Sequence, residues 1–410
     1  MSAAPPAAPD RHDQPDQPGR PDQPAQLDDA ELGAWLFLLH SPGIGRDAAR
    51  RLLAHFGSPQ AVLAASTVDR ASRVDAKAAA ALARPPDGHA LRLAATLAWR
   101  SAGPARRVMV LGEADYPPLL LHTADPPLLL YLQGRAELLS APSLAIVGSR
   151  QPSAQGLDNA RGFARTLSQA GWTIVSGLAA GIDGAAHDGA LSAVADGTGA
   201  GSTMAVIGTG IDQVYPRAHR ALAGRISELG LIVSELALGT PPLAANFPQR
   251  NRLIAGLSRG TLVVEAALRS GSLITARLAA EAGREVMALP GSVLSSQSQG
   301  CHALIRQGAA LVGSVAQVLE ELTALPPLAR PAPVPGRAAA VAASPPLPSA
   351  PPAKGDAVLA ALGHDPLSLD ALINRCGWPA PALSAHLLTL ELDGHVARLP
   401  GGLYQRRGSV

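Results

Sequence analysis

Short aliphatic runs alternate with amphipathic segments between residues 142 and 325 of this 410-residue chain. The runs that we expect to form strands cover residues 144–147, 173–175, 204–207, 231–234, 262–264, 286–289 and 310–312. Helical periodicity predicts crossover helices at 156–170, 183–195, 217–229, 249–257, 274–283 and 314–324. Continuously aliphatic strands joined by helices are typical of a parallel sheet that is covered on both faces. The pattern therefore predicts a doubly wound α/β domain, which we place at residues 105–325.

The stretch 31–104 has a different pattern, because leucine, alanine and arginine recur there at helical spacing without strand-like runs. The sequence Ser-Pro-Gly-Ile-Gly at residues 41–45 separates two of the predicted helices, which is the order of a helix-hairpin-helix (SAM-like) domain. The glycines of such a hairpin allow a tight turn and can direct backbone amides toward a phosphate. A plain helical turn without a ligand explains the same residues, so both interpretations stay open.

Residues 355–410 predict three helices, at 356–362, 368–374 and 380–392, followed by a β-hairpin over 394–405. This is the order of a winged helix, whose third helix can enter a major groove. The core of that third helix, 381–391, contains neither arginine nor lysine. Contact with DNA and contact with a protein therefore both remain possible for this domain.

Two proline-rich segments complete the predicted organisation. Residues 1–30 contain seven prolines and six aspartates, and residues 326–354 contain ten prolines. Segments with so few large apolar residues cannot bury enough surface to offset the entropy lost on ordering. We predict that 1–30 is disordered and that 326–354 is an extended Pro/Ala-rich linker.

Composition restricts the chemistry that the domains can perform. The net charge is +2 and 16% of the residues are charged, so nucleic-acid binding would require a local basic patch. The chain has only two lysines, Lys77 and Lys354, and neither follows the GxxxxG pattern of a P-loop. Cys301 and Cys376 lack the spacing of a disulfide framework or a zinc site. We expect no metal.

The sequence predicts a cytoplasmic protein. No apolar run reaches the roughly 20 residues that a membrane-spanning helix needs. The segment 118–132 comes nearest, and it is interrupted by His122 and by Asp125-Pro126-Pro127. The acidic, proline-rich N-terminus does not have the basic and apolar regions of a signal peptide.

Glycines and hydroxyl residues follow almost every predicted strand. They are Gly148-Ser149 after the first strand, Ser176-Gly177 and Gly181 after the second, Gly208-Thr209-Gly210 after the third, Ser234 at the end of the fourth, and Ser270-Gly271-Ser272 after the fifth. Ligands of open α/β sheets bind beyond the carboxyl ends of the strands, and exposed amides at helix starts bind phosphate. The strand ends are therefore the candidate site.

The candidate site does not have the sequence pattern of a dinucleotide-binding site. NAD or FAD would require GxGxxG after the first strand and an acidic residue at the end of the second. The first loop instead reads GSRQPSAQG, and the second strand ends without a carboxylate. We therefore expect no cofactor.

Arg150, Arg250 and Arg252 can converge at the strand ends. Arginine side chains match phosphate oxygens, and Phe247 can stack on an unpaired base. Alternatively, an arginine pairs with Glu235 or Glu265 and Phe247 lies in the core. Asp183 and His187, four residues apart on one helix, allow general acid–base chemistry. A structural role for that pair, with the aspartate as a helix cap, is the commoner arrangement.

The chain resembles the DNA-processing protein A (DprA/Smf) family through seven motifs in order. They are AIVGSR (145–150), SGLAAGIDGAAHDGAL (176–191), AVIGTGID through YP (205–216), SE (234–235), FPQRNRLIAGLS (247–258), SGSLITA (270–276) and GREVMALPG with GCHALIRQGA (283–291 and 300–309). The resemblance covers about residues 110–312. It implies a Rossmann-like, homodimeric protein that binds single-stranded DNA and loads the RecA recombinase during natural transformation, without enzymatic turnover.

The resemblance also implies the residues that contact DNA. They are Gly148, Ser149 and Arg150 of the GSR loop and Phe247, Arg250, Asn251 and Arg252 of the FPxRNR segment. The position of glycines and hydroxyls at the strand ends adds Ser176, Gly177, Gly181, Ser270, Gly271 and Ser272 to the expected DNA contacts. This sequence departs from the family at Ala180, where many relatives have a basic residue, so we expect one phosphate contact to be missing here.

Two enzymatic alternatives remain. Arg252, Arg259-Gly260-Thr261 and Glu265 faintly resemble the pattern of nucleoside-monophosphate phosphoribohydrolases, although the paired glycines before Gly-Thr are missing. A nuclease would need clustered carboxylates for metal ions. Asp183, Glu235 and Glu265 are available, but their spacing is not that of a recognisable ligand set.

Overall fold

The computed structural model describes residues 27–324 and, nearer the C-terminus, residues 358, 362, 367–376, 378–392, 395–399 and 403–406. The chain divides into two compact units, Met1–Ala338 and Ala339–Val410. The predicted linker 326–354 and most of the predicted disordered segment 1–30 lie outside the described residues.

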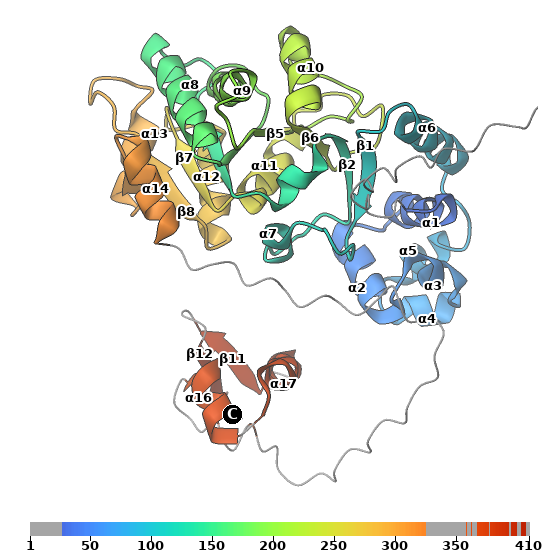
Figure 1. The fold of residues 1–410 in the computed structure, drawn as a ribbon. Coiled ribbons are helices and arrows are strands. Elements are labelled where there is room, and N and C mark those ends of the chain that lie inside the picture. Colours follow the sequence, from blue (N-terminus) through green and yellow to red (C-terminus); the bar gives the residue numbers. More distant parts are fainter. Residues whose placement is uncertain are drawn as a thin grey trace, which may run out of the picture. The chain divides into compact units, whose positions relative to one another are not determined.

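The first unit contains a nine-stranded sheet with the order β1-β2-β6-β5-β4-β3-β7-β8-β9 (Figure 1). Its strands are β1 (Arg106–Val110), β2 (Leu129–Gly134), β3 (Ser143–Val147), β4 (Thr173–Ser176), β5 (Thr203–Val206), β6 (Leu231–Ser234), β7 (Gly260–Val263), β8 (Glu285–Ala288) and β9 (Ala310–Leu311). The strands β3 to β9 are parallel to one another. β2 pairs antiparallel with β6, and β1 pairs antiparallel with β2. The predicted doubly wound parallel sheet is confirmed, with two antiparallel strands added at one edge.

Helices cover both faces of this sheet. They are α7 (Pro118–Leu121), α8 (Ala154–Gln169), α9 (Ile182–Ala195), α10 (Arg220–Leu229), α11 (Asn246–Leu257), α12 (Ser272–Glu281), α13 (Gln299–Arg306) and α14 (Val315–Thr323), with 3-10 turns η1 (Ala136–Ser140) and η2 (Arg217–His219). In β3, Leu144 and Ile146 pack with α8, α9 and α14, whereas Ala145 and Val147 pack with α11, α12 and α13. Successive side chains of a strand point to opposite faces, so an all-aliphatic strand contributes to both cores.

All seven strands and all six crossover helices predicted for this region are present within a few residues of the predicted bounds. The strands β1 and β2 and the helices α7 and α13 are additional.

Six short helices precede the sheet: α1 (Asp29–His40), α2 (Arg46–Phe56), α3 (Pro59–Ala64), α4 (Thr67–Ala71), α5 (Ala76–Ala81) and α6 (His89–Ser101). This region begins four residues earlier than predicted. Leu27 is buried in its core, and the Asp28 carboxylate caps α1 by accepting from the Glu31 amide. Residues 27–30 therefore do not belong to the segment predicted as disordered. Gly43 adopts a φ of 81° in the hairpin between α1 and α2, which favours glycine.

The second unit is a winged helix. It contains β10 (Leu367–Ser368), α16 (Leu369–Cys376), α17 (Ala380–Leu392) and the hairpin β11 (Val396–Leu399) and β12 (Leu403–Arg406), with the sheet order β10-β12-β11. Leu372, Leu383, Leu387 and Val396 form its buried core. The predicted helix 356–362 lies mostly outside the described residues. In the residues that the structure describes, no helix is long and apolar enough to cross a membrane.

Candidate nucleic-acid interface

A hollow of about 780 Å³ lies at the carboxyl ends of the parallel strands, and we call it the strand-end groove. It brings together residues from the loop after β3, from α11 and from the start of α12. The predicted contact residues that line it are Gly148, Ser149, Arg150, Phe247, Arg250, Asn251, Ser270, Gly271 and Ser272. The parallel arrangement places these loops at one edge of the sheet, although they are up to about 120 residues apart in sequence.

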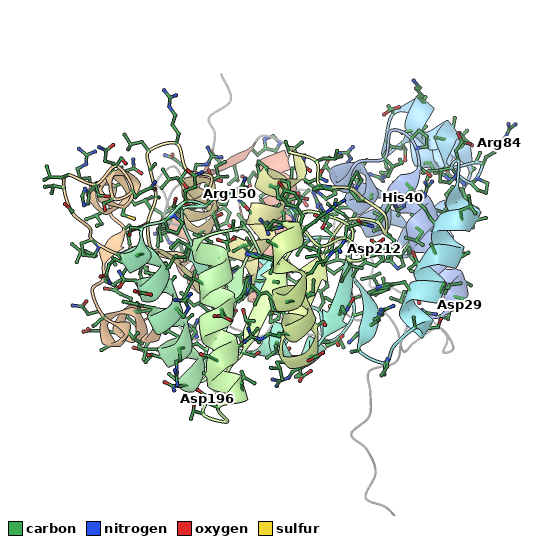
Figure 2. The ribbon with its side chains drawn as sticks, turned by 90° about the horizontal axis from the view of Figure 1, so that it is seen from above. Asp29, His40, Arg84, Arg150, Asp196 and Asp212 are labelled. Carbon is green, nitrogen blue, oxygen red and sulfur yellow. The ribbon has the colours of Figure 1, made fainter. Side chains whose placement is uncertain are left out.

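Arg150 is an exposed cation at this groove, in the loop between β3 and α8 (Figure 2). Its guanidinium carbon lies 5.8 Å from the centre of the Phe247 ring. The Phe247 ring in turn lies 5.5 Å from the ring of Tyr215, whose side chain is half exposed. Within residues 27–324, Arg150 forms no salt bridge with a carboxylate. An unpaired guanidinium beside two aromatic rings can bind a phosphate and stack a base.

Two further residues of this groove were not predicted as contacts. Tyr215 lies beside Phe247, and Arg269 is a second exposed arginine in the lining. The sequence carried a signal for both: Arg269 directly precedes the Ser270-Gly271-Ser272 motif, and Tyr215 is one of only four tyrosines. Asn251, which was predicted, donates its side-chain amide to the Gly271 carbonyl at 3.4 Å and thereby ties α11 to α12.

Arg250 has a different environment from Arg150, because it is only 6% exposed. Its Nη1 donates to the Gly177 carbonyl at 2.7 Å and to the Val206 carbonyl. Burial lowers the pKa of Arg250 to about 10, although the nearby Asp183 acts in the opposite direction. The guanidinium therefore stays charged at neutral pH and fixes the floor of the groove between β4 and β5.

Arg252 does not line the groove, and the expected convergence of three arginines is wrong for this residue. It donates to both oxygens of Glu235 and, at 2.5 Å, to the backbone carbonyl of Asp125. Arg46 and Arg50 of α2 bind the Asp125 carboxylate from the helical region. We call these five residues the ion-pair cluster. The alternative that an arginine of this stretch pairs with Glu235 is thus confirmed, and only 15% of the Arg252 side chain is exposed.

Comparison with known proteins identifies the family. The model of the family described as DNA recombination-mediator protein A matches residues 107–323. A second model, described as DprA winged helix domain, matches residues 342–402. The chain belongs to the DNA recombination-mediator protein A family.

Relatives of known name agree with this assignment. Protein Smf from Escherichia coli is 44% identical over 297 residues, which cover 71% of this chain and 75% of that protein. The DNA processing protein DprA of Streptococcus pneumoniae is 48% identical over 206 residues, covering 50% of this chain and 71% of that protein. Its crystal structure superposes with a TM-score of 0.60 at 36% identity, covering 72% of this chain and 99% of that one.

In this member of the family, three predicted contact residues shape the groove without lining it. The hydroxyl of Ser176 is buried and donates to the Ile146 carbonyl at 2.6 Å. A Cβ at Gly177 would lie 2.5 Å from the Arg250 guanidinium, and a Cβ at Gly181 would lie 2.3 Å from the Ser149 carbonyl oxygen. Glycine is required at both positions because the backbone of the loop 177–181 packs against the groove residues.

Asp183 and His187, the family's motif pair on α9, have structural roles. Asp183 accepts from the amides of Gly177 at 3.0 Å and Ala179 at 3.4 Å, so it holds the loop 177–181 rather than capping its own helix. His187 is fully buried between the Leu178 amide and the Thr203 hydroxyl. Burial lowers the pKa of His187 to about 3, so the imidazole is neutral at physiological pH and has no access to a substrate.

The N-terminus of α8, where a dinucleotide-binding fold would bind phosphate, is occupied by the side chain of Glu265. The Glu265 carboxylate accepts from the Ser153 amide at 2.9 Å and from its hydroxyl at 2.5 Å. A Cβ on Gly156 would lie 2.5 Å from this carboxylate. A dinucleotide pyrophosphate binds at the N-terminus of this first helix, so the carboxylate both repels and displaces it.

The residues of the two enzymatic alternatives are separated. Arg259 donates its amide to Ser143 at the amino ends of the strands, whereas Glu265 lies at the carboxyl ends. The three carboxylates considered for a nuclease have separate partners: Asp183 binds loop amides, Glu235 binds Arg252, and Glu265 binds Ser153. No group of three metal-binding side chains occurs in the part of the chain that the structure describes.

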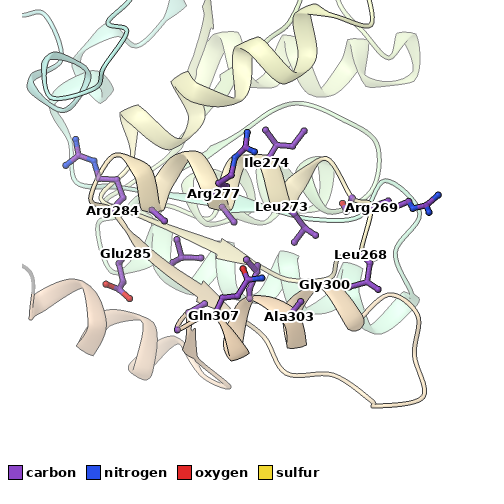
Figure 3. A pocket seen from close by; sticks show the side chains of 17 residues that line it. Leu268, Arg269, Leu273, Ile274, Arg277, Arg284, Glu285, Gly300, Ala303 and Gln307 are labelled. Atoms are coloured by element: carbon purple, nitrogen blue, oxygen red, sulfur yellow. The ribbon is translucent and has the colours of Figure 1, made fainter. Parts of the chain in front are cut away.

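A second hollow, of about 740 Å³, lies between α12 and α13 (Figure 3). Leu268, Leu273, Ile274 and Leu304 give it apolar walls, and Arg269 stands between it and the strand-end groove. It contains no aromatic side chain. The strand-end groove, with its rings and exposed arginines, is therefore the better candidate for nucleic acid.

Proposed function

We propose that this protein binds single-stranded DNA in the strand-end groove and delivers the strand to the RecA recombinase during natural transformation. The observation that carries the proposal is the arrangement of Arg150, Phe247 and Tyr215 at the groove. A phosphate can bind the free guanidinium of Arg150 while a base stacks on the neighbouring rings.

The chemistry favours a single strand over a duplex. Stacking on Phe247 requires a base that is not already stacked and paired in a double helix. The chain contains only 3% aromatic residues, so a long stacking platform is not available and most of the affinity must come from phosphate contacts. Binding of this kind depends on salt and tolerates any base sequence.

The relatives support a role in DNA metabolism. The family is described as a recombination mediator, and the Streptococcus pneumoniae relative is named a DNA processing protein. RecA as the partner, a homodimer as the functional form, and action in the cytoplasm extend the proposal on the strength of the family resemblance. We propose no catalytic residue, because the strand-end groove contains no activated nucleophile and its only carboxylate, Asp183, is held by backbone amides.

The test uses the full chain and fluorescently labelled single strands, with and without Mg²⁺. We expect binding to an intact strand in both conditions. Arg150→Ala should weaken binding about tenfold, because one charge-assisted contact is lost, and should leave the circular dichroism spectrum unchanged. Unchanged affinity in a natively folded variant would remove the groove as the site. Cleavage of the strand only when Mg²⁺ is present would instead indicate a nuclease.

A further inference from the structure

A third hollow, of about 340 Å³, lies on the face of the sheet covered by α8, α9 and α10. Leu157 and Arg161 of α8 form one wall, and Leu222 and Arg225 of α10 form the other. Its floor is α9, which presents Gly184, Ala185 and Asp188. The His219 ring lies over Gly184, where a Cβ would approach within 2.8 Å of the ring. We call this hollow the helix-face hollow.

Two arginines of the helix-face hollow share one aspartate. Asp188 lies 2.7 Å from Nη1 of Arg225 and 3.6 Å from Nε of Arg161. Arg161 also has the exposed Asp158 at 3.3 Å. Both arginine side chains are nearly half exposed, and such exposed ion pairs add little stability. Either guanidinium can therefore exchange a carboxylate oxygen for a phosphate oxygen at little cost.

Further positive charge lies beside this hollow. Arg217 and Arg220, in η2 and at the start of α10, are exposed and have no salt-bridge partner in the stretch 27–324. The segment 217–225 thus carries three arginines, of which Arg225 lines the hollow and Arg217 and Arg220 are exposed close to lining residues in the sequence. This excess of positive charge favours a polyanion over a neutral ligand.

The loop 177–181 is the boundary between the helix-face hollow and the strand-end groove. Ala179 lines the groove, whereas Gly181 and Gly184 line the hollow. The backbone of Gly181 packs directly against Ser149 and Arg150. Ala180 is exposed at this boundary and has only a methyl group, so its own side chain does not extend between the two hollows.

We propose that the helix-face hollow is a second phosphate-binding site, which holds the single strand after it leaves the strand-end groove past Arg150 and Ala180. This inference rests on the proposed function of the groove. From Gly181 to Asp188 the floor extends about 10 Å, at 1.5 Å per helical residue, which adds room for further nucleotides. Arg161 and Arg225 bind the phosphates of this extension, and Asp188 competes with those phosphates for the two guanidinium groups.

The chain provides a matched control on the same helix. Arg165 of α8 pairs with Asp196 at 2.8 Å and is as exposed as Arg161. Figure 2 shows Asp196 at the end of α8 and α9 opposite to Arg150. Arg165→Ala therefore removes one positive charge and one surface ion pair from the same helix, one turn beyond Arg161, at a residue that does not line the helix-face hollow.

The experiment measures binding of a length series of labelled oligo-dT to the full chain by fluorescence anisotropy. Arg161→Ala/Arg225→Ala should lower the affinity for the longer strands about five- to twentyfold, with a smaller loss for the shortest strand that binds. The salt slope for the longer strands should decrease by about 1.4, since each phosphate contact contributes about 0.7. Arg165→Ala should lower the affinity by no more than about twofold and should leave the salt slope nearly unchanged.

Asp188→Asn should change the affinity for the longer strands in the opposite direction. Removing the competing carboxylate should strengthen binding of the longer strands about two- to threefold, whereas Asp196→Asn should not. If the double arginine variant binds long strands as the Arg165→Ala control does, or if Asp188→Asn fails to strengthen binding, the extension is overturned while the groove remains. Failure of the wild-type chain to bind any single strand overturns the proposed function and the extension with it.

Discussion

The strand-end groove and the ion-pair cluster contain the same type of residue in two opposite situations. In the groove, Arg150 is exposed, lies over the Phe247 ring and has no salt bridge to any residue in 27–324. In the cluster, Arg252 is mostly buried and is bound by Glu235 and Asp125. Both arginines belong to motifs that the family resemblance assigns to DNA. The difference shows that the carboxylate partner, rather than the motif, decides which arginine is free for a phosphate.

Arg250 lines the groove but is buried, and its replacement should have the largest effect on stability. Arg250→Ala removes the guanidinium that binds the Gly177 and Val206 carbonyls, and it leaves the buried Asp183 without its neighbouring cation. We expect a loss of about 3–5 kcal/mol of unfolding free energy, the range for leaving buried polar and charged groups without a compensating cation. Chemical denaturation followed by circular dichroism measures it, with the exposed Arg269→Ala as the control. Equal stability of Arg250→Ala and the wild type would contradict the structural role.

Arg252→Ala should have the second largest effect. We expect it to lower the free energy of unfolding by about 1.5–3 kcal/mol, the range for hydrogen bonds to charged groups. The surface arginine Arg277, which pairs with Glu281 on one helix, is the matched control and should change stability by less than about 0.5 kcal/mol. Denaturation of the two variants under the same conditions gives the comparison. If the Arg252→Ala variant is as stable as the wild type but binds DNA more weakly, Arg252 contacts DNA and does not mainly stabilise the ion-pair cluster.

The same variant has an expected pH dependence. Burial raises the pKa of Asp125, but Arg252, Arg50 and Arg46 outweigh burial, and the net pKa lies below the usual 3.8. The stabilisation from this carboxylate is therefore complete above pH 3.8 and is lost as the pH falls through the lower pKa of the folded state. The stability difference between the wild type and Arg252→Ala should narrow in that acidic range. A difference that stays constant would mean that Asp125 is not the relevant partner.

The fold was largely predictable because most of its strands are short, aliphatic and separated by helices. The elements that were missed lack this pattern. The apolar stretch at 118–132 is divided between the short helix α7 and the start of β2, and an antiparallel edge pair gives no crossover helix to mark it. The helix α13 begins near Gly300, where a Cβ would lie 2.5 Å from the Ala266 carbonyl oxygen. A glycine required by close packing has the same sequence signal as a loop.

The site was predictable in position but not in the role of each residue. Glycines and hydroxyls at strand ends located the groove, because the topology of a parallel sheet brings its loops to one edge. Glu235 was among the expected partners of an arginine in this stretch, but the second partner of Arg252, Asp125, could not be derived, since it lies 127 residues earlier and is held by arginines from α2. The structural role of Ser176 likewise depends on the Ile146 carbonyl of the neighbouring strand. Long-range pairing of this kind leaves no local pattern.

The smallest expected effect is also the most direct comparison between the two regions. The groove has two exposed arginines, Arg150 and Arg269, so a short single strand should bind with a log–log salt slope near −1.4, at about −0.7 per phosphate. Arg150→Ala should reduce the magnitude of that slope by about 0.7. Arg252→Ala should leave the slope unchanged, because its guanidinium is already neutralised by Glu235 and Asp125.

Titrations at several salt concentrations with oligo-dT, oligo-dA and a mixed sequence measure this slope for each variant. Phosphate contact and stacking on Phe247 tolerate any base, so the three sequences should give similar affinities. A shallow slope with strong preference for one sequence would indicate hydrogen bonding to base edges instead. Equal loss of slope in Arg150→Ala and Arg252→Ala would mean that DNA displaces the carboxylates of the ion-pair cluster. The strand would then extend from the groove toward α2, because Asp125 connects Arg252 to Arg46 and Arg50.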